Sequence, residues 1–233
     1  NFESSWLLLS AMEHWVFVCD LAPNLREVDL RKVFCFYGDV ISLEHIDEAS
    51  GGSALIAYST KEAAQEATDI VHLASIRGKT CRCLLWNTVE AIWKTMDLGH
   101  RLKLEGLDYK ITSQAVEDMF SLFGPVLDCK VQMDEGEQSR GYGFVHFAEK
   151  EHATKAMQLL NGMQIGSSCI QVRLARPEDL EVFTGCIYSL QTAVSAVCPS
   201  TGEWMGGMDH YASSGGWEDF DGLAAWETHE PHG

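Results

Sequence analysis

The sequence predicts an α+β protein that contains two tandem copies of one β-α-β-β-α-β unit. Three observations predict this fold: the same order of apolar strands and helices occurs twice, the copies lie about 86 residues apart, and the first helix of each copy ends at a glycine, Gly38 or Gly124. Such a ferredoxin-like sandwich places both helices on one face of an antiparallel sheet. The other sheet face is then free to bind a ligand.

The first copy, repeat 1, is expected at residues 14–87. Apolar residues at alternate positions indicate strands, and apolar residues three and four apart indicate helices. The predicted elements of repeat 1 are, in order, a strand at 15–21, a helix carrying Val28, Leu30, Val33 and Phe34, strands at 40–46 and 54–58, a helix at 61–73 and a strand at 81–86.

The second copy, repeat 2, is expected at residues 101–176. Its predicted elements are a strand at 101–107, a helix carrying Val116, Met119, Phe120 and Phe123, strands at 126–133 and 142–147, a helix at 150–160 and a strand at 169–174. Ser113 is the expected N-cap of the first of these helices, with Thr112 as the alternative. A linker at 88–100 joins the two repeats.

The remaining residues, 177–233, form an acidic tail rich in glycine and tryptophan. The chain has a formal net charge of -17, and from Glu178 onward it has ten acidic residues and no lysine or arginine. The tail lacks periodicity from Gly202 on, so we expect it to be disordered. Residues 14–87 and 101–176 are nearly neutral, and a local basic patch on either can still attract a polyanion.

Composition argues against several other classes of protein. No uninterrupted apolar run approaches the roughly 18 residues of a membrane-spanning helix, so no membrane partner is expected. The eight cysteines include no Cys-x-x-Cys pair, and we interpret them as free thiols of a reducing compartment, not as disulfides or metal ligands. Catalytic signatures are absent. We therefore expect no catalytic residue, metal, cofactor or small-molecule substrate.

The most specific string in the chain is Arg140-Gly141-Tyr142-Gly143-Phe144-Val145-His146-Phe147. It fits the eight-residue signature of an RNA recognition motif at every position. On a strand, Arg140, Tyr142, Phe144 and His146 would share the open face, with Val145 and Phe147 in the core. Tyr142 and Phe144 would then stack on bases and Arg140 would pair with a phosphate. We expect the two glycines to keep the strand accessible to bases.

Around this octapeptide, repeat 2 resembles the second RNA recognition motif of the cytoplasmic polyadenylate-binding proteins. Repeat 1 is similar to the first motif of that family, more weakly. The segments that carry the resemblance are Cys129-Lys130-Val131 and Leu160-Asn161-Gly162-Met163 within residues 124–162, the opening hexapeptide at 16–21, and Trp86. The resemblance covers about residues 14–176 and implies two tandem RNA recognition motif domains.

The chain departs from the family pattern on both binding faces. In repeat 1 the segment that aligns with the octapeptide, Gly51 to Tyr58, lacks the basic residue and both stacking aromatics. Phe17 on the first strand is then the one aromatic expected to stack on a base in this repeat. In repeat 2, Lys103 stands where the family has an aromatic residue, and Glu105 stands where it has a lysine that helps to recognise adenine. Each lost stacking aromatic removes about 1 to 3 kcal/mol of binding free energy, so weaker binding than in the family is expected.

The resemblance implies single-stranded RNA, with mRNA poly(A) suspected, as the ligand of the repeat 2 sheet face. The expected RNA-binding residues are Arg140, Tyr142, Phe144, Lys103, Lys130 and Phe17. The alternative is a protein–protein interaction module with vestigial RNA binding, in which the depleted sheet of repeat 1 or the helical faces bind a peptide or a translation initiation factor. On the helical side of repeat 2, the resemblance suggests Glu117, Asp118 and Met157 as candidates for such a contact. The resemblance also implies a cytoplasmic location that extends to the nucleus.

Three interpretations of the tail beyond Gly202 remain open. Its acidic-aromatic composition fits a short linear motif, a pseudo-RNA segment that folds over Arg140, or an unusual terminus without a function.

Overall fold

The structure is a computed structural model, and it describes residues 14–46, 52–95, 99–134, 136–176 and 179. All of these belong to the first of two compact units, residues 1–193. The predictions for the tail beyond Gly202 lie outside the described residues. Within those residues, no helix is long and apolar enough to cross a bilayer.

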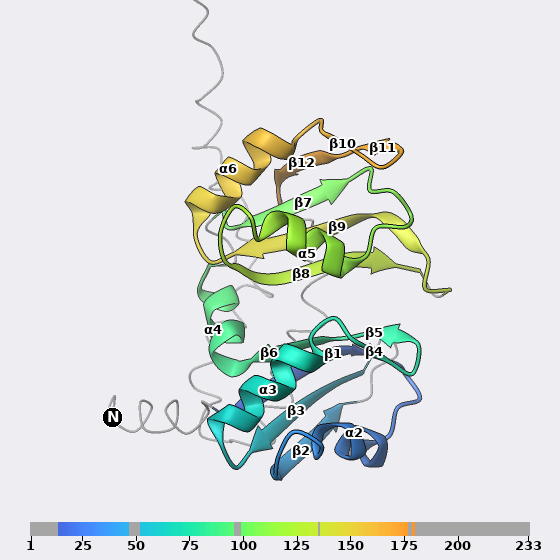
Figure 1. Cartoon of the computed structure of the whole chain (residues 1–233), viewed down its shortest axis with the longest axis vertical. Coiled ribbons are helices and arrows are strands. Elements are labelled where there is room, and N and C mark those ends of the chain that lie inside the picture. Colours follow the sequence, from blue (N-terminus) through green and yellow to red (C-terminus); the bar gives the residue numbers. More distant parts are fainter. Residues whose placement is uncertain (1–13, 47–51, 96–98, 135, 177–178, 180–233) are drawn as a thin grey trace, which may run out of the picture. The chain divides into compact units, whose positions relative to one another are not determined.

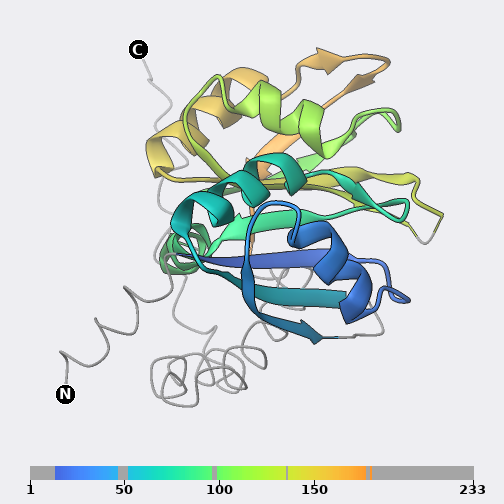
Figure 2. The same ribbon diagram turned by 60° about the horizontal axis from the view of Figure 1, so that its bottom comes forward.

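Repeat 1 is a four-stranded antiparallel sheet in the order β2-β3-β1-β6. Helices α2 and α3 cover one of its faces (Figures 1 and 2). Its elements are β1 (Trp15–Leu21), α2 (Glu27–Phe34), β2 (Val40–Ile46), β3 (Gly52–Tyr58), α3 (Lys61–Val71), β4 (Ser75–Ile76), β5 (Lys79–Thr80) and β6 (Arg82–Leu85).

The core of repeat 1 forms where the helices meet one side of the strands. The core side chains include Val16, Val18, Ile56 and Tyr58 from the strands, Leu30 and Phe34 from α2, and Ala64 and Ala67 from α3, all fully buried. The Tyr58 hydroxyl donates a hydrogen bond to the Phe34 carbonyl oxygen at 2.9 Å and so ties the end of α2 to β3. Small alanines let α3 lie close to the sheet.

Repeat 2 repeats this architecture, with strand order β12-β7-β9-β8 and helices α5 and α6 on one face (Figure 1). Its elements are β7 (Arg101–Glu105), α5 (Ser113–Phe120), β8 (Val126–Met133), β9 (Ser139–Phe147), α6 (Lys150–Leu160), β10 (Gln164–Ile165), β11 (Ser168–Cys169) and β12 (Gln171–Leu174). Its core includes Leu102, Leu104, Phe120, Val145 and Phe147, all fully buried. The predicted α+β class with two tandem ferredoxin-like domains is confirmed.

Some local details differ from the sequence-based expectation. Each repeat has a short hairpin, β4-β5 or β10-β11, before its last strand, and that strand begins at Arg82 or Gln171. The linker contains a helix, α4 (Trp86–Thr95), that was not predicted. Val28, one of the apolar residues that indicated this helix, is 49% exposed, whereas Leu30 and Phe34 are buried on the inner side of α2.

The N-cap of α5 is Thr112, the alternative to Ser113. The Thr112 hydroxyl oxygen accepts a hydrogen bond from the Ala115 N–H at 3.2 Å. Ser113 is the first residue of the helix, and its Oγ accepts from the Val131 N–H of β8 at 2.9 Å. The two hydroxyls thus have different roles, one at the helix terminus and one between α5 and the sheet.

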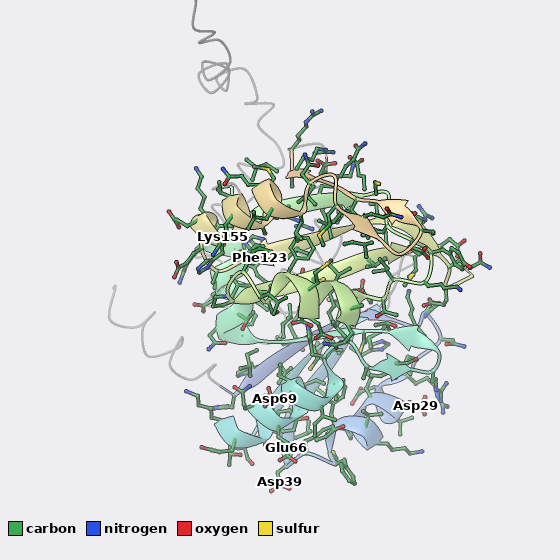
Figure 3. All side chains as sticks on the ribbon, turned by 45° about the horizontal axis from the view of Figure 1, so that its top comes forward. Asp29, Asp39, Glu66, Asp69, Phe123 and Lys155 are labelled. Atoms are coloured by element: carbon green, nitrogen blue, oxygen red, sulfur yellow. The ribbon has the colours of Figure 1, made fainter. Side chains whose placement is uncertain are left out.

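Acidic side chains on the helices form solvated surfaces. Figure 3 labels Glu66 and Asp69 on α3, and both are exposed, on the side opposite Ala64 and Ala67. The six cysteines in the described ranges are free thiols, and four of them are buried. No cluster of three metal-ligating side chains occurs among the residues with described positions.

Candidate nucleic-acid interface

The octapeptide lies on β9, between β7 and β8 in the middle of the repeat 2 sheet. The register pairs Phe144 with Lys103 and Tyr142 with Glu105 on β7. These four side chains extend from the sheet face opposite the helices, because neighbours on each strand, such as Val145, point into the core. The predicted alternation of the octapeptide is therefore present in the structure.

Half of the expected open face is covered. Phe144 is only 3% exposed, because the Arg101 guanidinium carbon lies 4.7 Å from the centre of its ring. His146 is 2% exposed, and its Nε2 lies 2.8 Å from the Thr95 hydroxyl of α4. Both side chains lie on the predicted face of the sheet, but they are buried because the first residue of β7 and the linker helix lie over this end of β9.

The accessible part of the face centres on Tyr142. Its ring is partly exposed and meets Phe144 edge-on, with ring centres 6.2 Å apart. The Lys103 ammonium lies 5.6 Å from the centre of the Tyr142 ring, and Arg140 is exposed beside it. The open cavity here, of about 470 Å³, is lined by Lys103, Glu105, Arg140, Gly141, Tyr142, Phe144 and Asp179. An aromatic face beside cations is what a single-strand site requires.

Lys103 belongs to a network of two cations and two carboxylates. Lys103 Nζ is 3.3 Å from Glu105 Oε1 and 2.7 Å from Asp179 Oδ1. Arg173 of β12 joins the network through its Nε, 3.3 Å from Glu105 Oε2, and its Nη1, 2.7 Å from Asp179 Oδ2. The hydrogen bond to Asp179 is the main cause that raises the pKa of both Lys103 and Arg173. The network carries no net charge.

Lys130 of β8 pairs in register with Phe144 on the same sheet face, but it does not line this cavity. Its ammonium pairs with the Asp20 carboxylate of β1 in repeat 1. Asp20 Oδ2 also accepts from Arg82 Nε at 2.6 Å, and Arg82 Nη1 donates to Asp128 Oδ2 of repeat 2 at 2.7 Å. Burial alone would raise the pKa of Asp20, but Arg82 and Lys130 hold it well below its usual range. In this structure Lys130 contributes to the contact between repeats.

The corresponding face of repeat 1 is apolar. Phe17, the predicted stacking residue, is 4% exposed, and β3 is buried along its whole length. Its buried side chains include Phe17, Cys19, Ser53, Leu55, Ala57 and Leu84, while the buried Arg82 of β6 and the exposed Glu44 of β2 lie on the same side of the outer strands. No lysine or arginine from the described part of β1 or β3 is present there. The one partly exposed aromatic of these two strands on this side is Trp15, at the start of β1, and the central position that Phe17 holds is covered.

Glycine is required at position 143 for the packing of two strands, and not only to keep the strand accessible to bases. A Cβ atom at this position would lie 2.6 Å from the Lys130 carbonyl oxygen and 3.2 Å from Val131 Cα on β8. No side chain fits at such distances without a shift of backbone. Gly143 therefore permits the close approach of β8 and β9.

Two residues of the network, Arg173 and Asp179, were missing from the sequence-based site. Arg173 alternates with Val172, a buried core residue, so the strand pattern already placed it on the binding face. Asp179 follows the last strand, where no periodicity signals its position. Its contact with Lys103 joins residues 76 positions apart in sequence.

A four-stranded antiparallel sheet with Arg-Gly-aromatic-Gly-aromatic on a central strand defines a class of RNA-binding module. The RNA recognition motif family model matches residues 16–82 and 102–171. The chain therefore belongs to the RNA recognition motif family and contains two copies of its domain. This domain is a binding module and not a catalytic one, in agreement with the prediction that the chain is not an enzyme.

A polyadenylate-binding protein of Candida glabrata, described as cytoplasmic and nuclear, is 33% identical over 161 residues. The match covers 67% of this chain but only 28% of the relative. The suspected resemblance to the polyadenylate-binding proteins, with tandem domains, is confirmed.

A solved structure shows the same fold. A chain of the rna15, hrp1 and anchor RNA 3′ processing ternary complex has a TM-score of 0.53 at 20% identity, over 70% of this chain and 96% of its own length. A chain of the Sxl-lethal protein/RNA complex has a TM-score of 0.42 at 20% identity, over 70% of this chain and 99% of its own length.

Proposed function

We propose that the chain binds single-stranded RNA through the sheet face of repeat 2, with poly(A) of mRNA as the ligand. The observation that carries the proposal is the Tyr142 ring, partly exposed in a cavity whose other lining residues include Arg140 and Lys103. An aromatic ring accepts a base by stacking, and the cations attract the phosphates on either side. The poly(A) preference is inferred from the similarity to the Candida glabrata protein.

The roles of the remaining predicted residues differ in this proposal. Phe144 supports the Tyr142 ring edge-on from beneath Arg101, and stacks on a base only if Arg101 moves away. Lys130 and Phe17 contribute indirectly, Lys130 through the contact between repeats and Phe17 through packing. By the same similarity, we infer that the protein acts in the cytoplasm and the nucleus.

The test is fluorescence anisotropy of the full chain with labelled oligoadenylate, in competition with oligouridylate and oligocytidylate. Tyr142→Ala should lower the affinity by about 5- to 150-fold, since one stacked base is worth about 1 to 3 kcal/mol. The matched control is Tyr109→Ala, because the Tyr109 side chain is 71% exposed outside the strands of the sheet. Equal affinities for Tyr142→Ala and the wild type would refute the site.

A protein-binding function is the second candidate, and exposed apolar side chains favour it. Phe36 is 86% exposed, and Leu122 is 83% exposed. Both stand two residues before the glycine that follows the first helix of their repeat. We propose a peptide or translation initiation factor as the partner, with Leu122 of repeat 2 in the contact. Binding that survives Tyr142→Ala, resists high salt and is lost in Leu122→Ser would support it, because apolar contacts do not release counterions.

A further inference from the structure

Asp179, five residues after the end of β12, is buried against the binding face. Its side chain is 5% exposed. Asp179 Oδ1 accepts from Lys103 Nζ at 2.7 Å and from Arg173 Nη2 at 3.1 Å. Asp179 Oδ2 accepts from Arg173 Nη1 at 2.7 Å and from the Arg176 backbone N–H at 2.8 Å. One carboxylate thus receives four hydrogen bonds.

These four donors have the geometry that proteins use for phosphate. A guanidinium that donates from two nitrogens, an ammonium and a backbone N–H converge on two oxygen atoms of one anion. Of these donors, Lys103 lines the cavity that contains Tyr142, as does the Asp179 acceptor, and the Lys103 ammonium is 5.6 Å from the centre of that ring. A nucleotide stacked on Tyr142 would therefore have its phosphate close to the position of the Asp179 carboxylate.

We propose that Lys103, Arg173 and the Arg176 backbone N–H form a phosphate-binding subsite, which Asp179 occupies until RNA displaces it. The proposal rests on the proposed RNA-binding function. With Asp179 in place, the two cations are balanced by Asp179 and Glu105, whereas without it the site has one net positive charge. RNA then binds only the fraction of molecules in which the carboxylate has left, and the apparent association constant is the intrinsic one multiplied by that fraction.

The ionisation of Asp179 agrees with this role. Burial would raise its pKa, but hydrogen bonds from Arg173, Lys103 and the Arg176 N–H hold the pKa well below the usual range for a carboxyl. The Asp179 carboxylate, which competes with the RNA phosphate, is therefore charged throughout the physiological pH range. Asp179 is also absent from the apolar core of repeat 2, so its substitution leaves the core residues in place.

The experiment compares Asp179→Asn with the wild type in the full chain, using labelled oligoadenylate at several salt concentrations. The matched control is Glu151→Gln, which removes one negative charge from the exposed side of α6. We expect Asp179→Asn to bind about tenfold more tightly at low salt, since one charge-assisted contact no longer opposes the phosphate. Glu151→Gln should change the affinity little.

The salt dependence separates competition from a structural effect. In the wild type, phosphate replaces a carboxylate and releases few counterions from this subsite. In Asp179→Asn, Lys103 and Arg173 carry counterions that RNA releases. The slope of log affinity against log salt should therefore become steeper by about 0.7 to 1.4, for one or two cations.

A second variant keeps the test decisive if Asp179→Asn also alters stability. Lys103→Met should remove most of the gain when added to Asp179→Asn, and should cost less affinity in the wild type, where Lys103 is already paired. Equal effects of Lys103→Met in both backgrounds would overturn the subsite.

The outcomes also separate the two proposals. If the wild type binds RNA through Tyr142 and Asp179→Asn behaves like Glu151→Gln, the subsite is wrong and the function stands. If neither the wild type nor Asp179→Asn binds any homopolymer at low salt, the function is wrong, and the subsite falls with it.

Discussion

The sheet faces of the two repeats differ at matching positions. On the first strand, Phe17 of repeat 1 corresponds to Lys103 of repeat 2. Each is paired in register with a residue of the last strand, Phe17 with Leu84 and Lys103 with Arg173. The same strand pairing thus carries two apolar side chains in repeat 1 and two cationic side chains in repeat 2. Function follows from side chains on the face and not from the fold.

The cations that repeat 1 does have are used differently. Arg82 of β6 is 3% exposed and pairs with Asp20 of its own repeat and Asp128 of the other. In repeat 2, Arg173 of the last strand lies on the cavity side and is 29% exposed. A buried guanidinium between two carboxylates holds elements together, whereas a partly exposed one can exchange its partner for a ligand.

The largest expected effect is therefore on stability, from Arg82→Met. It leaves Asp128, 4% exposed, without its hydrogen-bonded cation, and removing one partner of a buried pair costs about 3 to 5 kcal/mol. Urea unfolding measures the loss. Arg31→Met is the control, because the Arg31 guanidinium is an exposed partner of Glu27 and should contribute little. Similar losses in the two variants would contradict a structural role specific to Arg82.

The second prediction concerns His146, whose counterpart in repeat 1, Ala57, does not titrate. Burial, and next the Arg101 guanidinium, lower the pKa of His146 to about 3. An unfolded histidine has a pKa near 6.5, so below that pH the unfolded state binds a proton that the folded state does not. The free energy of unfolding should fall by about 1.4 kcal/mol per pH unit below pH 6.5 through this residue.

Urea unfolding at pH 7, 6 and 5 tests this prediction. His146→Gln should lose that part of the pH dependence, because glutamine does not titrate. The buried carboxyl of Asp128 does not interfere, because its pKa is lowered and it takes up a proton only below the tested range of pH 5 to 7. Identical pH profiles for the wild type and His146→Gln would contradict the burial of this ring beneath Thr95.

The sequence predicted the four main strands and the two helices of each repeat, and the place of the octapeptide on a strand, because each depends on local periodicity. It could not predict that Phe144 lies under Arg101 or that Lys130 pairs with Asp20. The Lys130–Asp20 contact joins residues 110 positions apart. Alternation assigns a side chain to one side of a strand, but only tertiary packing decides whether that side is covered.

The third prediction compares the two faces directly at one position of the octapeptide register. Tyr142 of β9 corresponds to Ser53 of β3. Tyr142→Ala should weaken RNA binding by about 1 to 3 kcal/mol. Ser53→Ala should change the affinity less than about twofold, since Ser53 is 2% exposed and offers no ring for stacking. A comparable loss from both variants, measured by anisotropy, would mean that repeat 1 also contacts the RNA.

The smallest effect is expected at the first helix of each repeat. Thr112 caps α5 through its side chain, whereas Arg26, the N-cap of α2, makes no side-chain capping hydrogen bond. Thr112→Ala should lower the free energy of unfolding by about 1 kcal/mol, because the Ala115 N–H loses its partner. Arg26→Ala should have a smaller effect, since its exposed guanidinium only pairs with Asp29. Equal losses in urea unfolding would show that the capping hydroxyl does not distinguish the two helices.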